Sequence, residues 1–83
     1  MTERTIRLIQ ERIYDPPRPV EVDREGRWVP ALQHAWHLWD DDRGWEARVE
    51  YTVTYPWGIR TRSTVVPADR LRLASEARAS LAS

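Results

Sequence analysis

Residues 45–66 read WEARVEYTVTYPWGIRTRSTVV, and this stretch decides the fold. From Trp45 to Tyr55, every odd position is apolar or aromatic and every even position is charged or a threonine. A period of two is typical of a strand that buries one face. The turn formers Pro56-Trp57-Gly58 interrupt the pattern, and a second alternating run follows at 59–66. The stretch therefore predicts a β-hairpin.

The segment before this hairpin, residues 28–39, has an ambiguous periodicity. One set of its apolar residues has helical spacing: Leu32, Ala35, Trp36 and Trp39. Another set shares one face of a strand: Trp28, Leu32, Trp36 and Leu38. Residues 40–44 have the composition of a turn, and so short a connection into the following strand favours a hairpin. We therefore predict a strand over 28–39.

The N-terminal quarter of the chain contains one further strand candidate, residues 18–23, which ends in a turn at 24–27. The proline-rich residues 15–19 are expected to form a stiff, extended linker, because proline cannot lie inside a helix. Residues 4–14 suit either element, since their isoleucines fit a helix face as well as a strand face.

The C-terminal part is expected to contain a tight turn at 67–70 and a short strand at 71–73. The tail, residues 74–83, is rich in alanine and serine and has little to bury. It is expected to be frayed or to form a short helix.

The order of these elements predicts an all-β protein. Several short strands at close spacing, separated by turn signals, are typical of a sandwich or a barrel. Because 83 residues form one small domain, and because closure removes exposed strand edges, we expect a single small barrel of about five strands. Its core is expected over about 20–73, with residues 1–19 as a poorly defined N-terminal extension.

Three motifs carry a resemblance to a known class of fold: GRWVPA at 26–31, WEARVEY at 45–51 and VPADRLR at 66–72. Together they resemble the SH3-like small barrels, and most closely the Tudor and agenet-type modules. Gln33 departs from the Tudor-like pattern, which has an apolar residue there. The resemblance covers roughly 20–73 and implies an SH3-like barrel with a one-turn helix before its last strand. The same order also resembles short bacterial proteins of high-GC genomes that have no assigned activity.

Composition narrows the classes of function. The chain has no cysteine, which leaves no disulfide framework and no thiolate metal site. Thirteen basic residues, all arginine, balance thirteen acidic ones, and a zero net charge argues against strong non-specific binding to nucleic acid. The arginine bias fits GC-rich coding DNA or the use of bidentate guanidinium contacts. Without a long apolar run or a signal-peptide pattern, we expect a cytoplasmic protein that does not enter a membrane.

No motif indicates an enzyme, a cofactor or a metal centre. The chain contains no nucleophile elbow, no dinucleotide-binding glycine pattern and no phosphate-binding loop. His34 and His37 would share a helix face, but on a strand they are expected to point to opposite faces, so no metal site is predicted. Glu46 and Glu50 are expected to be solvated or to pair with Arg48, Arg60 or Arg62 across the hairpin.

The surplus of aromatic residues indicates binding of a partner. Five tryptophans and three tyrosines are more than a small core can hold. Trp45, Tyr51 and Tyr55 share the expected core face of their strand. Trp39 and Trp57 lie beside turns and are expected to be exposed, although Trp57 could instead fold over the mouth of the barrel.

Two functions follow from these residues, with the oligomeric state left open. The first is a non-catalytic module that binds a protein or peptide partner through Trp39, Tyr55 and Trp57. The alternative is a small nucleic-acid-binding barrel that uses an arginine face formed by Arg60, Arg62, Arg70 and Arg72.

Overall fold

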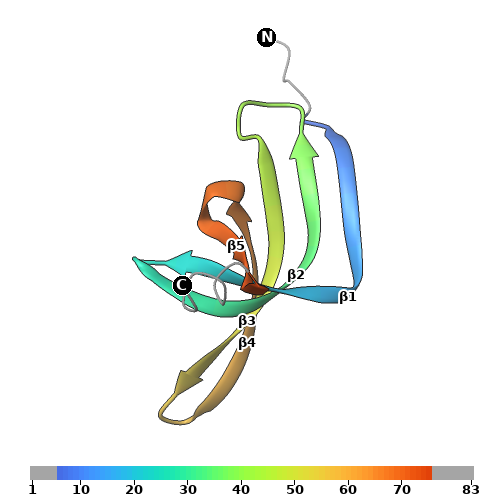
Figure 1. The fold of residues 1–83 in the computed structure, drawn as a ribbon. Coiled ribbons are helices and arrows are strands. Elements are labelled where there is room, and N and C mark those ends of the chain that lie inside the picture. Colours follow the sequence, from blue (N-terminus) through green and yellow to red (C-terminus); the bar gives the residue numbers. More distant parts are fainter. Residues whose placement is uncertain (1–5, 76–83) are drawn as a thin grey trace.

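The structure is a computed structural model, and it describes residues 6–75. It is an all-β fold in which five strands form one antiparallel sheet of order β4-β3-β2-β1-β5 (Figure 1). The elements in chain order are β1 (Leu8–Arg24), β2 (Arg27–Trp39), β3 (Trp45–Tyr55), β4 (Gly58–Pro67), the 3-10 helix η1 (Ala68–Arg70) and β5 (Leu71–Leu73). Within the described residues, no helix has the length and apolarity that crossing a membrane would need.

The predicted hairpin at residues 45–66 is confirmed as β3 and β4. Their ladder is continuous from Glu46 opposite Pro67 to Tyr55 opposite Gly58, which leaves only Pro56 and Trp57 in the turn. Gly58 has a φ of 150°, a value that side chains with a Cβ rarely adopt. The alternation and the turn residues of the sequence therefore agree with the ladder.

The strand predicted over 28–39 is also confirmed, since β2 ends at Trp39 just before the acidic turn. The turn that joins β1 to β2 consists of Glu25 and Gly26, with φ values of 53° and 84°. Two successive positive φ values are the signature of a type I′ turn, whose twist matches that of the flanking strands. The Gly26 N–H also donates to Oδ1 of Asp23 at 3.0 Å.

Strand β1 resolves the open question about the N-terminal segment. It extends over Leu8–Arg24, so the residues that fitted a helix or a strand are a strand from Leu8 onward. This part was expected to be an extension, but it pairs with the C-terminal half of β2. The register shifts between Ile13 and Arg18, because Pro16 and Pro17 have no N–H to donate to the ladder.

The two faces of the sheet differ in composition, and we call them the inner and the outer face. The inner face carries the core, whose buried members are Val20, Val22, Ala31, Ala47, Val49 and Tyr51. Residues of β4 and β5 pack against this cluster, including Val66, Leu71 and Leu73. The outer face carries the alternate residues of each strand.

The sheet is bent so that its two ends approach the same core. β5 pairs with β1 at Val20–Val22, while β4 is the last strand at the other end of the order. Over the described residues no ladder joins β4 to β5, so the two ends meet through side-chain packing. This arrangement is compatible with a small β-barrel-like fold.

The tight turn and short strand predicted at 67–73 correspond to η1 and β5. Most of the tail expected at 74–83 lies outside the described residues.

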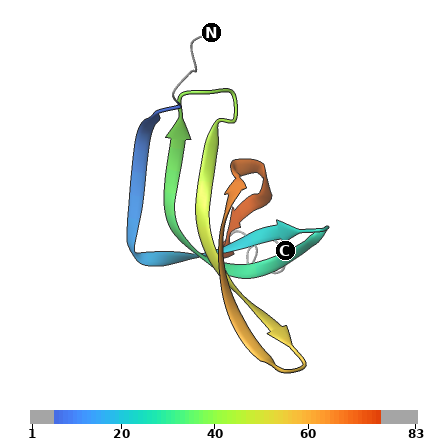
Figure 2. The same cartoon turned by 180° about the vertical axis from the view of Figure 1, so that it is seen from behind.

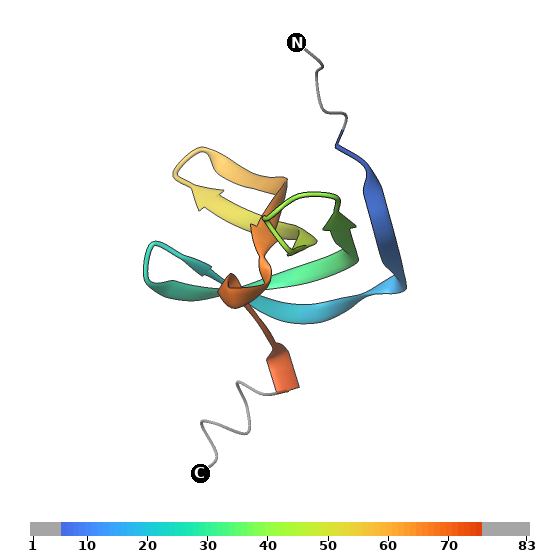
Figure 3. The ribbon, with the colours of Figure 1, turned by 90° about the horizontal axis from the view of Figure 1, so that it is seen from above.

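Two hairpin ends project beyond the core. The β3–β4 hairpin extends away from the other strands (Figures 1 and 2). Seen from above, it and the β1–β2 turn point to the same side of the molecule (Figure 3). Nine of the ten residues of β4 are exposed, so this arm is held mainly by its ladder with β3.

A bulge in β2 decides which of its residues face inward. Gln33 is opposite Val49 and Ala35 is opposite Arg48, so His34 is an extra residue without an opposite partner on β3. Such an insertion reverses the alternation beyond it. Trp36 consequently lies opposite Ala47 and packs against the core.

Candidate functional site

The tip of the β3–β4 hairpin presents two stacked aromatic rings. Tyr55 and Trp57 have ring centroids 4.7 Å apart and an angle of 8° between their planes. Trp57 is 76% exposed, so it does not fold back over the core, and its predicted exposure is confirmed. Tyr55 lies on the inner face, as expected, but outside the core: it is half-buried at the tip, and its hydroxyl accepts a hydrogen bond of 2.7 Å from Nη2 of Arg62.

Arg60 and Arg62 lie on the inner face of β4. They are opposite Val53 and Tyr51 of β3, and both are exposed. No described acidic residue forms an ion pair with either of them. The hairpin therefore combines two unneutralised guanidinium groups with an exposed aromatic stack.

The pairing expected between these arginines and the glutamates of β3 is wrong. Glu46 and Glu50 lie on the outer face, opposite Pro67 and Ser63. Glu50 is bonded to His34 Nε2 at 2.9 Å, and Glu46 accepts a hydrogen bond from Arg43 at 3.2 Å. The alternation of the strand separates the acids of β3 from the arginines of β4.

Trp39, the third aromatic residue predicted to bind a partner, does not join this group. It lies at the start of the connection to β3, whereas Tyr55 lies at the other end of β3, roughly 30 Å along the strand. Trp39 is half-buried, and the Arg43 guanidinium carbon lies 5.4 Å from its ring centroid. The structure thus places the predicted aromatic residues at two ends of the molecule.

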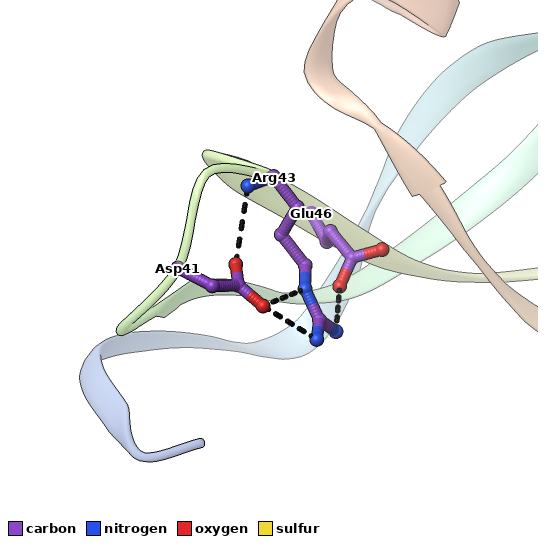
Figure 4. A network of polar contacts seen from close by, with 3 residues as sticks. All are labelled: Asp41, Arg43 and Glu46. Atoms are coloured by element: carbon purple, nitrogen blue, oxygen red, sulfur yellow. Dashed lines mark hydrogen bonds and ion pairs between the residues drawn. The ribbon is translucent and has the colours of Figure 1, made fainter. Parts of the chain in front are cut away.

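The acidic turn holds Arg43 in place (Figure 4). Asp41 accepts bonds from the backbone N–H of Arg43 at 3.1 Å and from its Nε at 2.7 Å, and Glu46 accepts from Nη1. These bonds, that to Asp41 first and that to Glu46 second, raise the pKa of the Arg43 guanidinium above its ordinary value. The network holds the turn together and gives Asp41 and Glu46 a shared cationic partner.

The predicted arginine face does not form as one surface. Two of its members, Arg70 and Arg72, lie on η1 and β5 rather than on β4 with Arg60 and Arg62. Arg72 donates to Glu21 of β1, with Nε to Oε1 at 2.7 Å, and its guanidinium carbon lies 4.3 Å from the ring centroid of Trp28. Its charge is therefore neutralised in the sheet. The two pairs of arginines belong to opposite ends of the strand order.

The expectation that His34 and His37 point to opposite faces is wrong, because the bulge at His34 changes the alternation between them. Both side chains lie on the outer face, where His34 bonds Glu50 and His37 bonds Glu11 at 2.8 Å. Each histidine thus has its own carboxylate. In the described part of the chain, no group of three potential ligands is placed to hold a metal ion.

A second polar and aromatic group, which was not among the predicted sites, lies on the inner face at the other end of β3. A groove of about 580 Å³ opens there between β1, β2, the start of β3 and η1. Its lining includes Arg12, Tyr14, Arg18, Trp36 and Trp45.

The sequence contained two signals for this groove. Gln33 interrupts an apolar pattern, and Arg18 stands between prolines. In the structure Gln33 is fully buried, and its Oε1 accepts a hydrogen bond of 2.7 Å from Nε of Arg18. Trp45 was expected in the core, but it is 38% exposed and packs edge-to-face on Trp36 at 6.4 Å.

Comparisons with protein-family models, with curated proteins and with solved structures found no match in any of the three. The function must therefore be inferred from the chemistry of these two regions.

Proposed function

We propose that this chain is a non-catalytic interaction module that binds an extended, acidic segment of a partner protein along the free side of β4. One observation carries the proposal: β4 is a terminal strand of the sheet, and it bears two arginines without acidic partners beside an exposed Tyr55–Trp57 stack. The strand edge is complementary to a peptide backbone, the two arginines to carboxylate side chains, and the aromatic stack to one flat or apolar side chain.

We also propose a finer assignment of the fold, as an SH3-like barrel, and the strand order supports it. A meander of four strands, a one-turn 3-10 helix and a short fifth strand paired with the first is the arrangement expected of an SH3-like barrel. Barrels of this class bind peptides and other ligands through loops and strand edges that surround a small, rigid core.

The exposed side of β4 is suited to strand addition. Its backbone N–H and C=O groups on that side have no partner strand among the described residues, and unpaired edges accept a further strand readily. A peptide bound there would place alternate side chains on the inner face, beside Arg60 and Arg62. Guanidinium groups bind carboxylates in a bidentate manner, so acidic residues at alternate positions would be preferred.

The proposal is tested with two sets of fluorescent ten-residue peptides, one that alternates valine with glutamate and one that alternates valine with lysine. Fluorescence anisotropy is expected to show binding of the acidic peptides only. The double variant Arg60→Glu, Arg62→Glu is expected to weaken that binding at least about tenfold, and Trp57→Ala by a smaller factor.

Arg48→Glu is the matched control, because Arg48 is exposed on the outer face of the same hairpin and has no ion pair with a described residue. It is expected to leave the affinity for the acidic peptides unchanged. Equal binding of both peptide sets, or an equal loss from Arg48→Glu and from the inner-face pair, would refute recognition along β4.

The alternative is a nucleic-acid-binding barrel, and the stacked rings beside Arg60 and Arg62 are the observation in its favour. Aromatic rings with nearby arginines can stack on bases and contact phosphates. A labelled oligothymidylate separates the two functions. If it binds in low salt, weakens steeply as salt increases and loses affinity in Arg60→Ala while acidic peptides do not bind, the nucleic-acid function replaces the proposed one.

A further inference from the structure

Arg18 is an arginine with one edge anchored and the other free. Its Nε donates to the buried side chain of Gln33, which in turn donates from Nε2 to the carbonyl oxygen of Ala35 at 3.1 Å. No hydrogen bond joins Nη1 or Nη2 of Arg18 to another described residue. The guanidinium plane is thereby oriented before any ligand arrives, and less conformational freedom is lost when one binds.

Aromatic rings surround the anchored guanidinium. Its central carbon lies 4.4 Å from the ring centroid of Tyr14 and 5.9 Å from that of Trp36. Trp45 packs on the edge of Trp36 and lines the same groove. Arg18 therefore lies against apolar walls, where a charge-assisted hydrogen bond is stronger than in open water.

A second arginine adds positive charge at the same place. Arg12 lines the groove, and its guanidinium carbon lies 5.3 Å from the same Tyr14 ring. Six positions separate Arg12 from Arg18 in sequence, yet they lie opposite Trp36 and Gln33, which are only three apart on β2. The irregularity around Pro16 and Pro17 shortens the distance along the strand and so brings the two cations together.

The described lining of the groove contains a single carboxylate, and that carboxylate is bonded to a histidine. Glu11 is the one acidic residue in its described lining, and its Oε2 is bonded to His37 Nε2 on the outer face. Gln10 adds an amide, and Ala68 of η1 closes the opposite wall.

We infer that this groove binds a small organic anion, a carboxylate or phosphate group carried on a flat apolar body. The anion would accept hydrogen bonds from Nη1 and Nη2 of Arg18, with Arg12 adding charge. The flat body would lie against Trp36 and Trp45. This site is separate from Arg60 and Arg62, since Trp45 lies at the other end of β3 from the residues opposite these arginines, and it does not depend on the proposed peptide function.

Benzoate and phenyl phosphate are suitable probes, with benzyl alcohol as the uncharged control and inorganic phosphate as the control without a ring. Titration of the full chain is followed by NMR through the Arg18 Nε–H signal and the indole N–H signals of Trp36 and Trp45. Both ring-bearing anions are expected to bind with a Kd on the order of millimolar, and both controls more weakly. Whichever anion binds more tightly identifies the group that the site prefers.

Four variants test the assignment of the contacts. Arg18→Gln is expected to weaken benzoate binding at least about tenfold, and Arg12→Gln, which removes the guanidinium group beside the Tyr14 ring, by a smaller factor. Gln33→Leu is expected to weaken binding while keeping the sheet, because it removes the anchor of Nε and retains an apolar core residue. Arg48→Gln on the outer face is expected to have no effect.

Three results would overturn the inference: no movement of the Trp36 and Trp45 signals with either anion, equal affinity for benzoate and benzyl alcohol, or unchanged affinity in Arg12→Gln and Arg18→Gln. The double variant Arg60→Glu, Arg62→Glu is expected to bind benzoate normally. A loss of benzoate binding in that variant would place the anion site on β4 instead and would likewise refute this assignment.

Discussion

At the scale of single residues, Gln33 is the most unusual position in the protein. Among the described residues it is the one buried polar side chain, and it lies between the apolar positions of β2. Both of its polar atoms are satisfied, Oε1 by Arg18 and Nε2 by the carbonyl oxygen of Ala35. A buried amide is tolerated when its hydrogen bonds are made and is costly when one is lost.

The stability of this pair can be tested directly. Arg18→Met is expected to lower the free energy of unfolding by about 1–3 kcal/mol, because it leaves the buried Oε1 of Gln33 without a donor. Adding Gln33→Leu is expected to restore much of the loss, since two apolar side chains then face each other. Urea unfolding followed by tryptophan fluorescence measures both changes. A double variant less stable than Arg18→Met would show that the amide is not the source of the cost.

At the scale of elements, irregular backbone determines which side chains meet. The bulge at His34 turns Trp36 inward and brings both histidines to the outer face. The shift between Ile13 and Arg18 brings two arginines to one groove. Each irregularity adds residues to one strand only, so every later side chain changes its neighbours across the sheet.

The turn between β1 and β2 offers a prediction at this scale. Glu25 adopts a φ of 53°, and its side chain has no hydrogen bond to another described residue. Glu25→Asn is expected to raise the free energy of unfolding by about 0.5–1 kcal/mol, because asparagine before glycine is favoured in a type I′ turn. Thermal unfolding measures the change.

Gly26→Ala is the opposite test of the same turn. Gly26 has a φ of 84°, and alanine there is expected to lower the free energy of unfolding by about 1 kcal/mol or more. Space is not the cause, since an added Cβ would meet no atom within 4 Å. If both variants left the melting temperature unchanged, the type I′ geometry would be wrong.

At the scale of the whole molecule, a small core supports two projecting regions. The buried cluster consists of a few valines, two alanines and Tyr51, where β1, β2 and β3 overlap. The β4 arm and the N-terminal half of β1 extend beyond it, and they carry exposed apolar side chains such as Ile13 and Ile59. The candidate binding regions lie on these extensions, at opposite ends of β3.

The core should therefore respond to mutation much more strongly than the arm. Val49→Ala, at a fully buried position, is expected to lower the free energy of unfolding by roughly 1–3 kcal/mol because it leaves a cavity. Val65→Ala, at a position 51% exposed on β4, is expected to change it by no more than about 0.5 kcal/mol. Chemical denaturation of the two variants compares them, and similar losses would mean that the arm is packed rather than projecting.

The sequence by itself determined most of the elements of this protein, although it left residues 4–14 open between a helix and a strand. Period-two alternation predicted β3 and β4, turn chemistry placed the connections at 24–27 and 40–44, and the tight turn before the last strand was correct. The exposure of Trp57 also followed from its place beside Pro56 and Gly58. These features are local, because each depends on the backbone preferences of a few neighbouring residues.

Only the tertiary structure decided which residues share a surface. Arg18, Gln33 and Trp36 come together through register shifts, and nothing in their spacing reveals how β1 and β2 pair. The unbroken ladder between β3 and β4 puts the acids of β3 on the outer face and the arginines Arg60 and Arg62 on the inner face. Pairing across a sheet joins residues far apart in the chain, and one extra residue in a strand reverses the face of all that follow.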